Sequence, residues 1–361
     1  MINVFDELFV LEISTNHWGS VERGLEIIDQ HAKVVNRNGV RAAIKLQVRD
    51  VQNFIHPDHW STGNDASDIS MLPKRERYIE KTKRTQLDHA GYQVLVDSIK
   101  RNGIEPIATA FDEQSVDTCL SLGITIIKVA SADFHDFNLL EKIAETRLPV
   151  IASTGGCTES QIDDGVDFFT AKNIPLALNH CVSLYPTEDS DLQLNQIDYL
   201  KKRYPDLTIG FSSHEYHDWQ SSMYISFAKG ARLWERHIDI PYSNGFEQKA
   251  VTPYCSLPYQ IDTWFKAYHH AKLMCGSDRN RRRVISPEES QYLKSLHRGI
   301  YFSRDIGAGE LLNTGDFFVA IPCQYELGQI PSGGLDDRKY RAAMKLSKGQ
   351  PVTKDCLTHV L

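Results

Sequence analysis

Residues 207–237 read LTIGFSSHEYHDWQSSMYISFAKGARLWERH. Two short apolar runs, 207–211 and 231–237, flank a segment of helix length, 221–229, so the stretch predicts a strand–helix–strand unit. A histidine follows the first predicted strand, His214, and another ends the second, His237. Because such a unit brings the ends of two parallel strands to one side of a sheet, we expect the two imidazoles to be neighbours.

The same alternation recurs along most of the chain. Eight apolar runs predict strands at 8–14, 42–47, 106–110, 125–130, 149–153, 175–181, 207–211 and 231–237. Amphipathic segments of helix length separate them, at 21–35, 87–101, 115–122, 139–146, 159–171 and 221–229. Eight strand–helix repeats over about 250 residues predict a (β/α)₈ TIM barrel. The alternative, an open doubly wound sheet, is disfavoured because no Gly-x-Gly-x-x-Gly follows the first strand.

The pattern of predicted strands, helices and turns changes along the chain and predicts two domains. Residues 1–276 form the predicted barrel, in which the polar segment 48–83 is expected to be a long loop. A linker is expected at 277–294, where an arginine-rich run turns apolar. Residues 295–361 have short strand and turn patterns and predict a small β-rich domain.

Composition narrows the classes of function. The formal charge of −7 argues against a general nucleic-acid-binding protein. The N-terminal residues do not have the pattern of a signal peptide, and no apolar run is long enough to cross a membrane. The seven cysteines are scattered, without a Cys-x-x-Cys motif, which fits a reducing compartment. We therefore expect a cytoplasmic protein that binds neither membrane nor nucleic acid.

Polar side chains punctuate the ends of the predicted strands, where barrel enzymes carry their active sites. Lys45 and Lys128 lie inside apolar strands, and a buried ammonium group needs an anion. Together with the hydroxyls of Ser131, Ser153 and Ser212, they favour binding of phosphate and carboxylate over purely structural ion pairs.

Glu12 and the two histidines each allow two interpretations. Glu12 is either a general acid or base or the partner of Lys45 in a buried ion pair, and both can hold together. His214 and His237 are either metal ligands or hydrogen-bonded core imidazoles.

The ordered set of motifs resembles the sialic acid synthase (N-acetylneuraminate synthase) family, including its spore-coat polysaccharide relatives. The motifs are EIxxNH from Glu12, KLQ from Lys45, KVAS from Lys128, CVSLYP from Cys181, IGFSSHE from Ile209 and ERH from Glu235. LHRGI from Leu296, IGAGE from Ile306 and KGQPV from Lys348 are similar to the C-terminal antifreeze-like (SAF) domain of that family.

The resemblance implies a metal-dependent condensation of phosphoenolpyruvate with an N-acylated amino sugar, first of all N-acetylmannosamine. The product would be a nine-carbon 2-keto-3-deoxy sugar acid, released with phosphate. His214 and His237 would hold Mn²⁺, or else Mg²⁺ or Co²⁺, and would be catalytic with Glu12 and Lys45. The implied phosphoenolpyruvate contacts are Lys45, Thr109, Lys128, Ser131, Ser153, Ser183 and Ser212. The implied sugar contacts are Gln47, Tyr185, Glu235, Glu247 and Arg298.

The resemblance also implies a domain-swapped homodimer in which Arg298 reaches the barrel of the partner subunit. Several positions depart from the family pattern: Ser183 replaces an asparagine, Glu247 an aspartate and Leu46 a phenylalanine, and the segment 48–83 does not match well. Three alternatives stay open: an acceptor of the legionaminic or pseudaminic type, a shorter octulosonate-type product, and a barrel that binds sugar without catalysis.

Overall fold

The computed structural model describes residues 3–60, 69–242, 250–276, 282–336 and 338–360. It divides the chain into two compact units, Met1–Ser277 and Asp278–Leu361. None of the helices in these residues is long and apolar enough to cross a membrane.

The first unit is a closed barrel of eight parallel strands in sequential order, as predicted, and the open doubly wound sheet is excluded. The strands are β1 Leu8–Ser14, β2 Ala42–Val48, β3 Glu105–Ala110, β4 Ile127–Val129, β5 Val150–Ser153, β6 Leu176–Cys181, β7 Thr208–Ser213 and β8 Leu233–His237. All eight lie where the apolar runs placed them.

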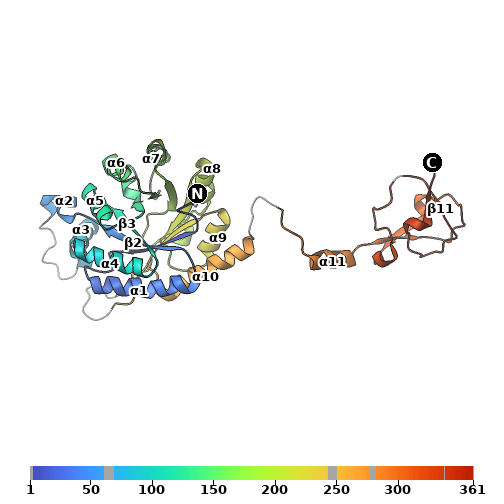
Figure 1. Cartoon of the computed structure of the whole chain (residues 1–361), viewed down its shortest axis with the longest axis horizontal. Helices are drawn as coiled ribbons and strands as arrows, with labels where there is room; N and C mark the ends of the chain where they lie inside the picture. Colours follow the sequence, from blue (N-terminus) through green and yellow to red (C-terminus); the bar gives the residue numbers. More distant parts are fainter. Residues whose placement is uncertain (1–2, 61–68, 243–249, 277–281, 337, 361) are drawn as a thin grey trace. The chain divides into compact units, whose positions relative to one another are not determined.

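Helices surround the barrel, as Figure 1 shows for the labelled helices from α1 to α10. They are α1 Val21–Asn38, α2 Val51–Phe54, α3 Lys74–Arg84, α4 His89–Arg101, α5 Glu113–Ser121, α6 Phe137–Glu145, α7 Glu159–Ala171, α8 Asn195–Arg203, α9 Ser221–Lys229 and α10 Pro258–Cys275. Side-chain caps fix several of their starts; for example, Asp112 accepts a hydrogen bond from the backbone N–H of Ser115 at 2.7 Å.

The prediction of a long loop at 48–83 is wrong, because much of this segment is helical. Its described part contains α2, two 3₁₀ turns at Pro57–His59 and Ile69–Met71, and the three-turn helix α3. The sequence of α3, KRERYIEKTKR, has only two apolar residues, too few to form the apolar stripe by which a helix is predicted. This helix matters because it brings Lys81, together with Tyr78 and Thr82, to the mouth of the barrel.

Inside the barrel, the inward-facing side chains are apolar near the starts of the strands and polar near their carboxyl ends. Inward-facing residues near the strand starts are apolar and pack together: Leu8, Val10, Ala43, Ile107, Ile126, Ile151, Ala177 and Leu233. Two or four residues further along the same faces the side chains become polar, as at Glu12, Lys45 and Lys128. The outward-facing residues form the larger core against the helices. A packed apolar layer therefore closes the bottom of the barrel, and a polar cavity lies above it.

The second unit is small and rich in short strands. It contains helix α11 Pro287–Ser295, which begins inside the predicted linker and ends one residue beyond it. Its strands are β9 Gly299–Phe302, β10 Phe317–Ala320, β11 Tyr340–Ala342 and β12 Leu357–His359. The strands form two antiparallel pairs, β9 with β10 and β11 with β12. A separate apolar core that includes Ile300, Phe302 and Leu346 holds the unit together. The predicted β-rich C-terminal region is therefore present.

Candidate active site

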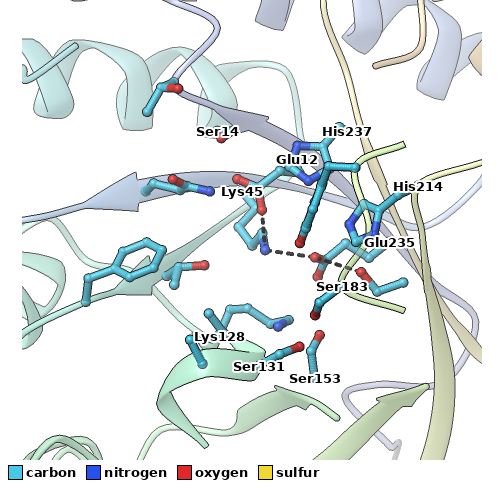
Figure 2. Close-up of a pocket in the computed structure, with 18 of the residues that line it drawn as sticks. Glu12, Ser14, Lys45, Lys128, Ser131, Ser153, Ser183, His214, Glu235 and His237 are labelled. Atoms are coloured by element: carbon cyan, nitrogen blue, oxygen red, sulfur yellow. Dashed lines mark hydrogen bonds and ion pairs between the residues drawn. The ribbon is translucent and has the colours of Figure 1, made fainter. Parts of the chain in front are cut away.

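A cavity of about 430 Å³ opens at the carboxyl ends of the barrel strands (Figure 2). Of the predicted site residues, the following line it: Glu12, Lys45, Gln47, Thr109, Lys128, Ser131, Ser153, Ser183, Tyr185, Ser212, His214, Glu235 and His237. Glu247 lies outside the described residues. Arg298 is an exposed residue of the second unit, directly before β9.

Lys45 lies between two buried carboxylates. Its Nζ pairs with Glu12 Oε2 and lies 2.9 Å from Glu235 Oε1. Strand register explains the first contact, because Glu12 of β1 is directly opposite Lys45 of β2. Burial lowers the pKa of Lys45 to about 8, although Glu235 opposes this shift. The ion pair considered for Glu12 is therefore real, and its second oxygen, Oε1, is buried without a hydrogen-bond partner in the described chain.

Lys128 has a different environment. The side chain is only 2% exposed, and its Nζ donates to the carbonyl oxygen of Val129 at 2.7 Å. Among the described residues it makes no ion pair within 4 Å, although its charge lowers the pKa of Glu235 and opposes the rise in the pKa of Asp133. An uncompensated buried ammonium group is costly and is retained where an anionic ligand binds.

Hydroxyl groups collect around Lys128. Ser131, Ser153, Ser183 and Ser212 lie at or just after the carboxyl ends of four consecutive strands, β4 to β7, and Figure 2 shows the first three close to the Lys128 amine. Ser131 Oγ accepts a hydrogen bond from the backbone N–H of Gly155 at 3.0 Å, which fixes its position. Gly155 is required there, since a Cβ atom would collide with the hydroxyls of Ser183 and Ser131. The arrangement suits an anion with several acceptor oxygens.

The two histidines are neighbours, as their strands predicted. Their ring centroids are 5.4 Å apart, and the ring of Tyr185 lies 4.0 Å from that of His214. Tyr254 adds a second aromatic wall, 5.3 Å from the ring of His237. Burial lowers the pKa of His214 to about 4, and burial together with His214 lowers the pKa of His237 well below its usual value. Both imidazoles are therefore neutral at pH 7.

Neutral imidazoles fit the ligand set of a divalent metal. His214 Nδ1 lies 3.0 Å from the carbonyl oxygen of Val182, an acceptor that keeps the proton on Nδ1 and leaves Nε2 free to ligate. His237 Nδ1 is buried with no hydrogen-bond partner among the described residues. Within the same residues, no group of three or more histidine, cysteine, aspartate or glutamate side chains could hold a metal. An ion here would thus use two protein ligands and take the rest from substrate and water.

A buried ion pair supports the loop that carries His214. Arg236, fully enclosed beside Glu235 and His237 on β8, bonds Glu215 Oε1 and the backbone oxygen of Glu215, both at 2.6 Å. Its Nε also donates to Ser256 Oγ at 2.6 Å. Arg236 therefore ties the residue after His214 to the strand that ends in His237.

Sequence reasoning missed several residues of the cavity wall. Arg49, Tyr78, Lys81 and Thr82 come from the segment expected to be a loop, and Tyr254 from the stretch between β8 and α10. Arg49 could have been found, because it continues the inward face of β2 two residues after Gln47. Lys81 had no such signal, because it depends on the position of α3.

The comparisons with known proteins agree with this geometry. The sequence profile of the NeuB family matches residues 34–254. The chain belongs to the NeuB family. Enzymes of this family are typically metal-dependent. The predicted resemblance to the sialic acid synthases is confirmed, and so is the predicted enzyme class, a phosphoenolpyruvate-dependent synthase of sialic-acid-type sugar acids.

Relatives within the NeuB family make different sugar acids. The chain is 31% identical to the N-acetylneuraminate-9-phosphate synthase of Drosophila melanogaster, over 74% of this chain and 69% of the relative. It is 26% identical to the pseudaminic acid synthase of Campylobacter jejuni, over 86% of each. A crystal structure of the spore coat polysaccharide biosynthesis protein E of Chromobacterium violaceum superposes with a TM-score of 0.85. That match has 33% identity and covers 98% of this chain and 99% of the other.

Proposed function

We propose that this protein condenses phosphoenolpyruvate with an N-acylated amino sugar, N-acetylmannosamine in the first instance, and releases phosphate. The product is a nine-carbon 2-keto-3-deoxy sugar acid. The observation that carries the proposal is Lys128, a buried cation without an ion pair, in one cavity with two neutral histidines. One end of the cavity suits an anion and the other suits a metal.

Phosphoenolpyruvate would bind on the side formed by β2 to β7. Lys128 and the hydroxyls of Ser131, Ser153, Ser183 and Ser212 offer donors for its phosphate. Lys45 and Thr109 would hold its carboxylate; they lie on neighbouring strands, and Thr109 is directly opposite Gln47, two residues after Lys45, in the pairing of β2 with β3. In this site, Ser183 replaces an amide donor with a hydroxyl donor and keeps the ability to bind phosphate oxygens.

His214 and His237 would hold Mn²⁺, with Mg²⁺ or Co²⁺ as alternatives, and the bound ion would polarise the sugar aldehyde as a Lewis acid. Their neutral state at pH 7 supports this assignment. Tyr185 and Tyr254 would shield the reacting carbonyl from bulk water, because their rings stand against both imidazoles.

The proposed condensation proceeds in three steps, and one carboxylate of the cavity, Glu12, has a role in it. C3 of phosphoenolpyruvate attacks the aldehyde carbon, the aldehyde oxygen takes up a proton to become a hydroxyl, and the new C–C bond leaves an oxocarbenium ion at C2. Water adds to C2 and gives up a proton. The C2–O bond to phosphate then breaks, the C2 hydroxyl loses its remaining proton to the departing phosphate or to solvent, and the ketone forms. Glu12 is the proposed acceptor of the water proton, because its Oε1 is buried without a partner while Oε2 stays paired with Lys45.

The sugar would be oriented by Gln47, Tyr185 and Glu235, with Glu247 as a further contact. We also propose that Arg298 enters the barrel of a second subunit in a domain-swapped homodimer, with the second unit acting as an antifreeze-like domain. Arg298→Ala should then raise the KM for the sugar more than the KM for phosphoenolpyruvate. Equal effects on both would count against the partner-arm arrangement.

A phosphate-release assay tests the proposed function. Purified protein loaded with Mn²⁺ is mixed with phosphoenolpyruvate and a panel of amino sugars. Release that depends on the sugar and stops on chelation is expected. No release with any sugar in metal-replete protein would instead favour a barrel that binds sugar without catalysis.

The acceptor has a second candidate. The similarity to the pseudaminic acid synthase of Campylobacter jejuni and to an N,N'-diacetyllegionaminic acid synthase of Legionella pneumophila, at 25% identity over 94% of this chain, favours diacetamido-dideoxy hexoses. Such sugars belong in the same panel, and the sugar with the highest kcat/KM decides between the two classes.

A further inference from the structure

We propose that a second cavity of the barrel unit binds a small, neutral molecule that carries several hydroxyl groups. This cavity has a volume of about 340 Å³ and lies at the neighbouring helices α8 and α9 (Figure 1) and the loops that precede them. Among the described residues its wall shares no member with the active-site cavity, and no strand contributes to it. The volume suits a metabolite-sized ligand. The inference does not depend on the proposed function.

The buried carboxylate of Glu215 is the observation that points to a ligand. Glu215 is 1% exposed and forms part of the cavity wall. Its Oε1 accepts hydrogen bonds from Arg236 Nη1 at 2.6 Å and from the hydroxyl of Ser222. Its Oε2 is buried and has no hydrogen-bond partner among the described residues. Because a buried oxygen without a donor is costly, a donor from a molecule in the cavity would stabilise it.

The charges of the wall favour a neutral donor. Arg236 already pairs with Glu215, so a cationic ligand would bring a second positive charge to a balanced ion pair. Lys229 is the single cation of the described wall, and it pairs with Asp198 at 2.6 Å. An anionic ligand would therefore meet the carboxylates of Glu215 and Asp218 without a cation to balance it.

The remainder of the wall suits a hydroxylated ring. Such a ring has hydroxyl groups at its edge and an apolar face of C–H groups. Side-chain amides and hydroxyls can both donate and accept hydrogen bonds, and aliphatic side chains can cover the apolar face. The polar part of the wall includes Gln193, Asn195 and Ser221, and the apolar part consists of Leu192, Leu194 and Ile225.

Contacts between the surrounding segments form the cavity before any ligand binds. The hydroxyl of Tyr216 donates to Glu188 Oε1 at 2.7 Å, which joins the loop after β7 to the loop after β6. The ion pair between Lys229 and Asp198 joins α9 to α8. A site that is already formed loses less conformational entropy when a ligand binds.

Binding of simple sugars to the full chain tests the inference without turnover. Glucose, N-acetylglucosamine and myo-inositol are the neutral probes, and glucuronate and glucosamine are the anionic and cationic counterparts of glucose. By calorimetry we expect at least one neutral probe to bind with a Kd of about 1 mM or below, and glucuronate to bind about tenfold more weakly than glucose. Tighter binding of glucosamine than of every neutral probe would overturn the assignment of a neutral ligand. No binding of any neutral probe at about 10 mM would overturn the site itself.

Two substitutions on the same helix locate the bound sugar. Ile225→Trp fills the cavity from its exposed side, whereas Ala228→Trp adds the same ring at an exposed position of α9 outside the wall. We expect binding to be lost in the first variant and kept in the second, with equal circular dichroism. Asn195→Leu adds no bulk and should weaken binding by about three- to tenfold. Full binding in both Ile225→Trp and Asn195→Leu would place the sugar elsewhere and refute the site.

Discussion

Two lysines in one cavity should respond in opposite ways to the same substitution. Methionine has nearly the shape of lysine, so Lys45→Met and Lys128→Met each remove a charge and little packing. Lys45 bridges Glu12 and Glu235, and its loss leaves two buried carboxylates facing each other. We expect Lys45→Met to destabilise the barrel by about 3–5 kcal/mol. Lys128 has no carboxylate partner in the described residues, so Lys128→Met should be neutral or stabilising, by up to about 1–4 kcal/mol.

The same substitution, Lys128→Met, should lower the activity. If its ammonium group binds the phosphate of phosphoenolpyruvate, its loss removes a charge-assisted hydrogen bond worth about 1.5–3 kcal/mol. This corresponds to a fall in kcat/KM for phosphoenolpyruvate of about 10- to 150-fold. A residue that destabilises the folded protein but binds the substrate is typical of a functional site.

The structure offers a selective probe of barrel stability. All five tryptophans, residues 18, 60, 219, 234 and 264, belong to the first unit, so their fluorescence in a urea titration reports on the barrel alone. The phosphate-release assay at varied phosphoenolpyruvate concentration gives the kinetic half. The reasoning would be refuted if Lys128→Met destabilised the barrel as much as Lys45→Met, because Lys128 would then be a structural cation.

Three further predictions use other parts of the site. His237→Ala should abolish Mn²⁺ binding and turnover without changing the far-ultraviolet circular dichroism; full activity in the variant after chelation would exclude the metal role. Gly155→Ala should raise the KM for phosphoenolpyruvate by about tenfold, since its Cβ would displace the Ser183 and Ser131 hydroxyls, and an unchanged KM would remove these serines from the phosphate site. Burial lowers the pKa of His17 and of His31 from 6.5 to about 4. The unfolded chain therefore binds protons that the folded barrel does not, and stability should fall between about pH 6.5 and 4 by up to about 3 kcal/mol per histidine. His31→Leu should flatten that slope in urea titrations, and an unaltered slope would contradict the assignment.

Much of the barrel and its mouth could be predicted from the sequence because one physical rule governs both. Alternate residues of a strand face the same side, so a run such as Leu8, Val10, Glu12 shows where the interior changes from apolar to polar. The lysines, serines and histidines lie at the carboxyl ends of the predicted strands, where barrel enzymes carry their active sites, so the sequence predicts that they share one site.

The remainder of the site depends on contacts that a linear pattern does not carry. Helix α3 has a charged sequence and forms at the mouth of the barrel through tertiary contacts, such as the hydrogen bond from Lys83 to the carbonyl oxygen of Trp60 at 2.6 Å. For this reason Lys81 was missed. The ion pair between Glu12 and Lys45 was foreseen as one of two interpretations, and only the strand register shows that it forms.

The central claim is that this cavity joins phosphoenolpyruvate to an amino sugar. Mass spectrometry of the product made from phosphoenolpyruvate labelled with ¹³C at all three carbons, Mn²⁺ and the sugar panel tests it most directly. We expect a sugar acid that contains the carbons of the acceptor sugar and all three labelled carbons, formed together with phosphate. Labelled pyruvate alone, or phosphoenolpyruvate left intact with every sugar, would contradict it.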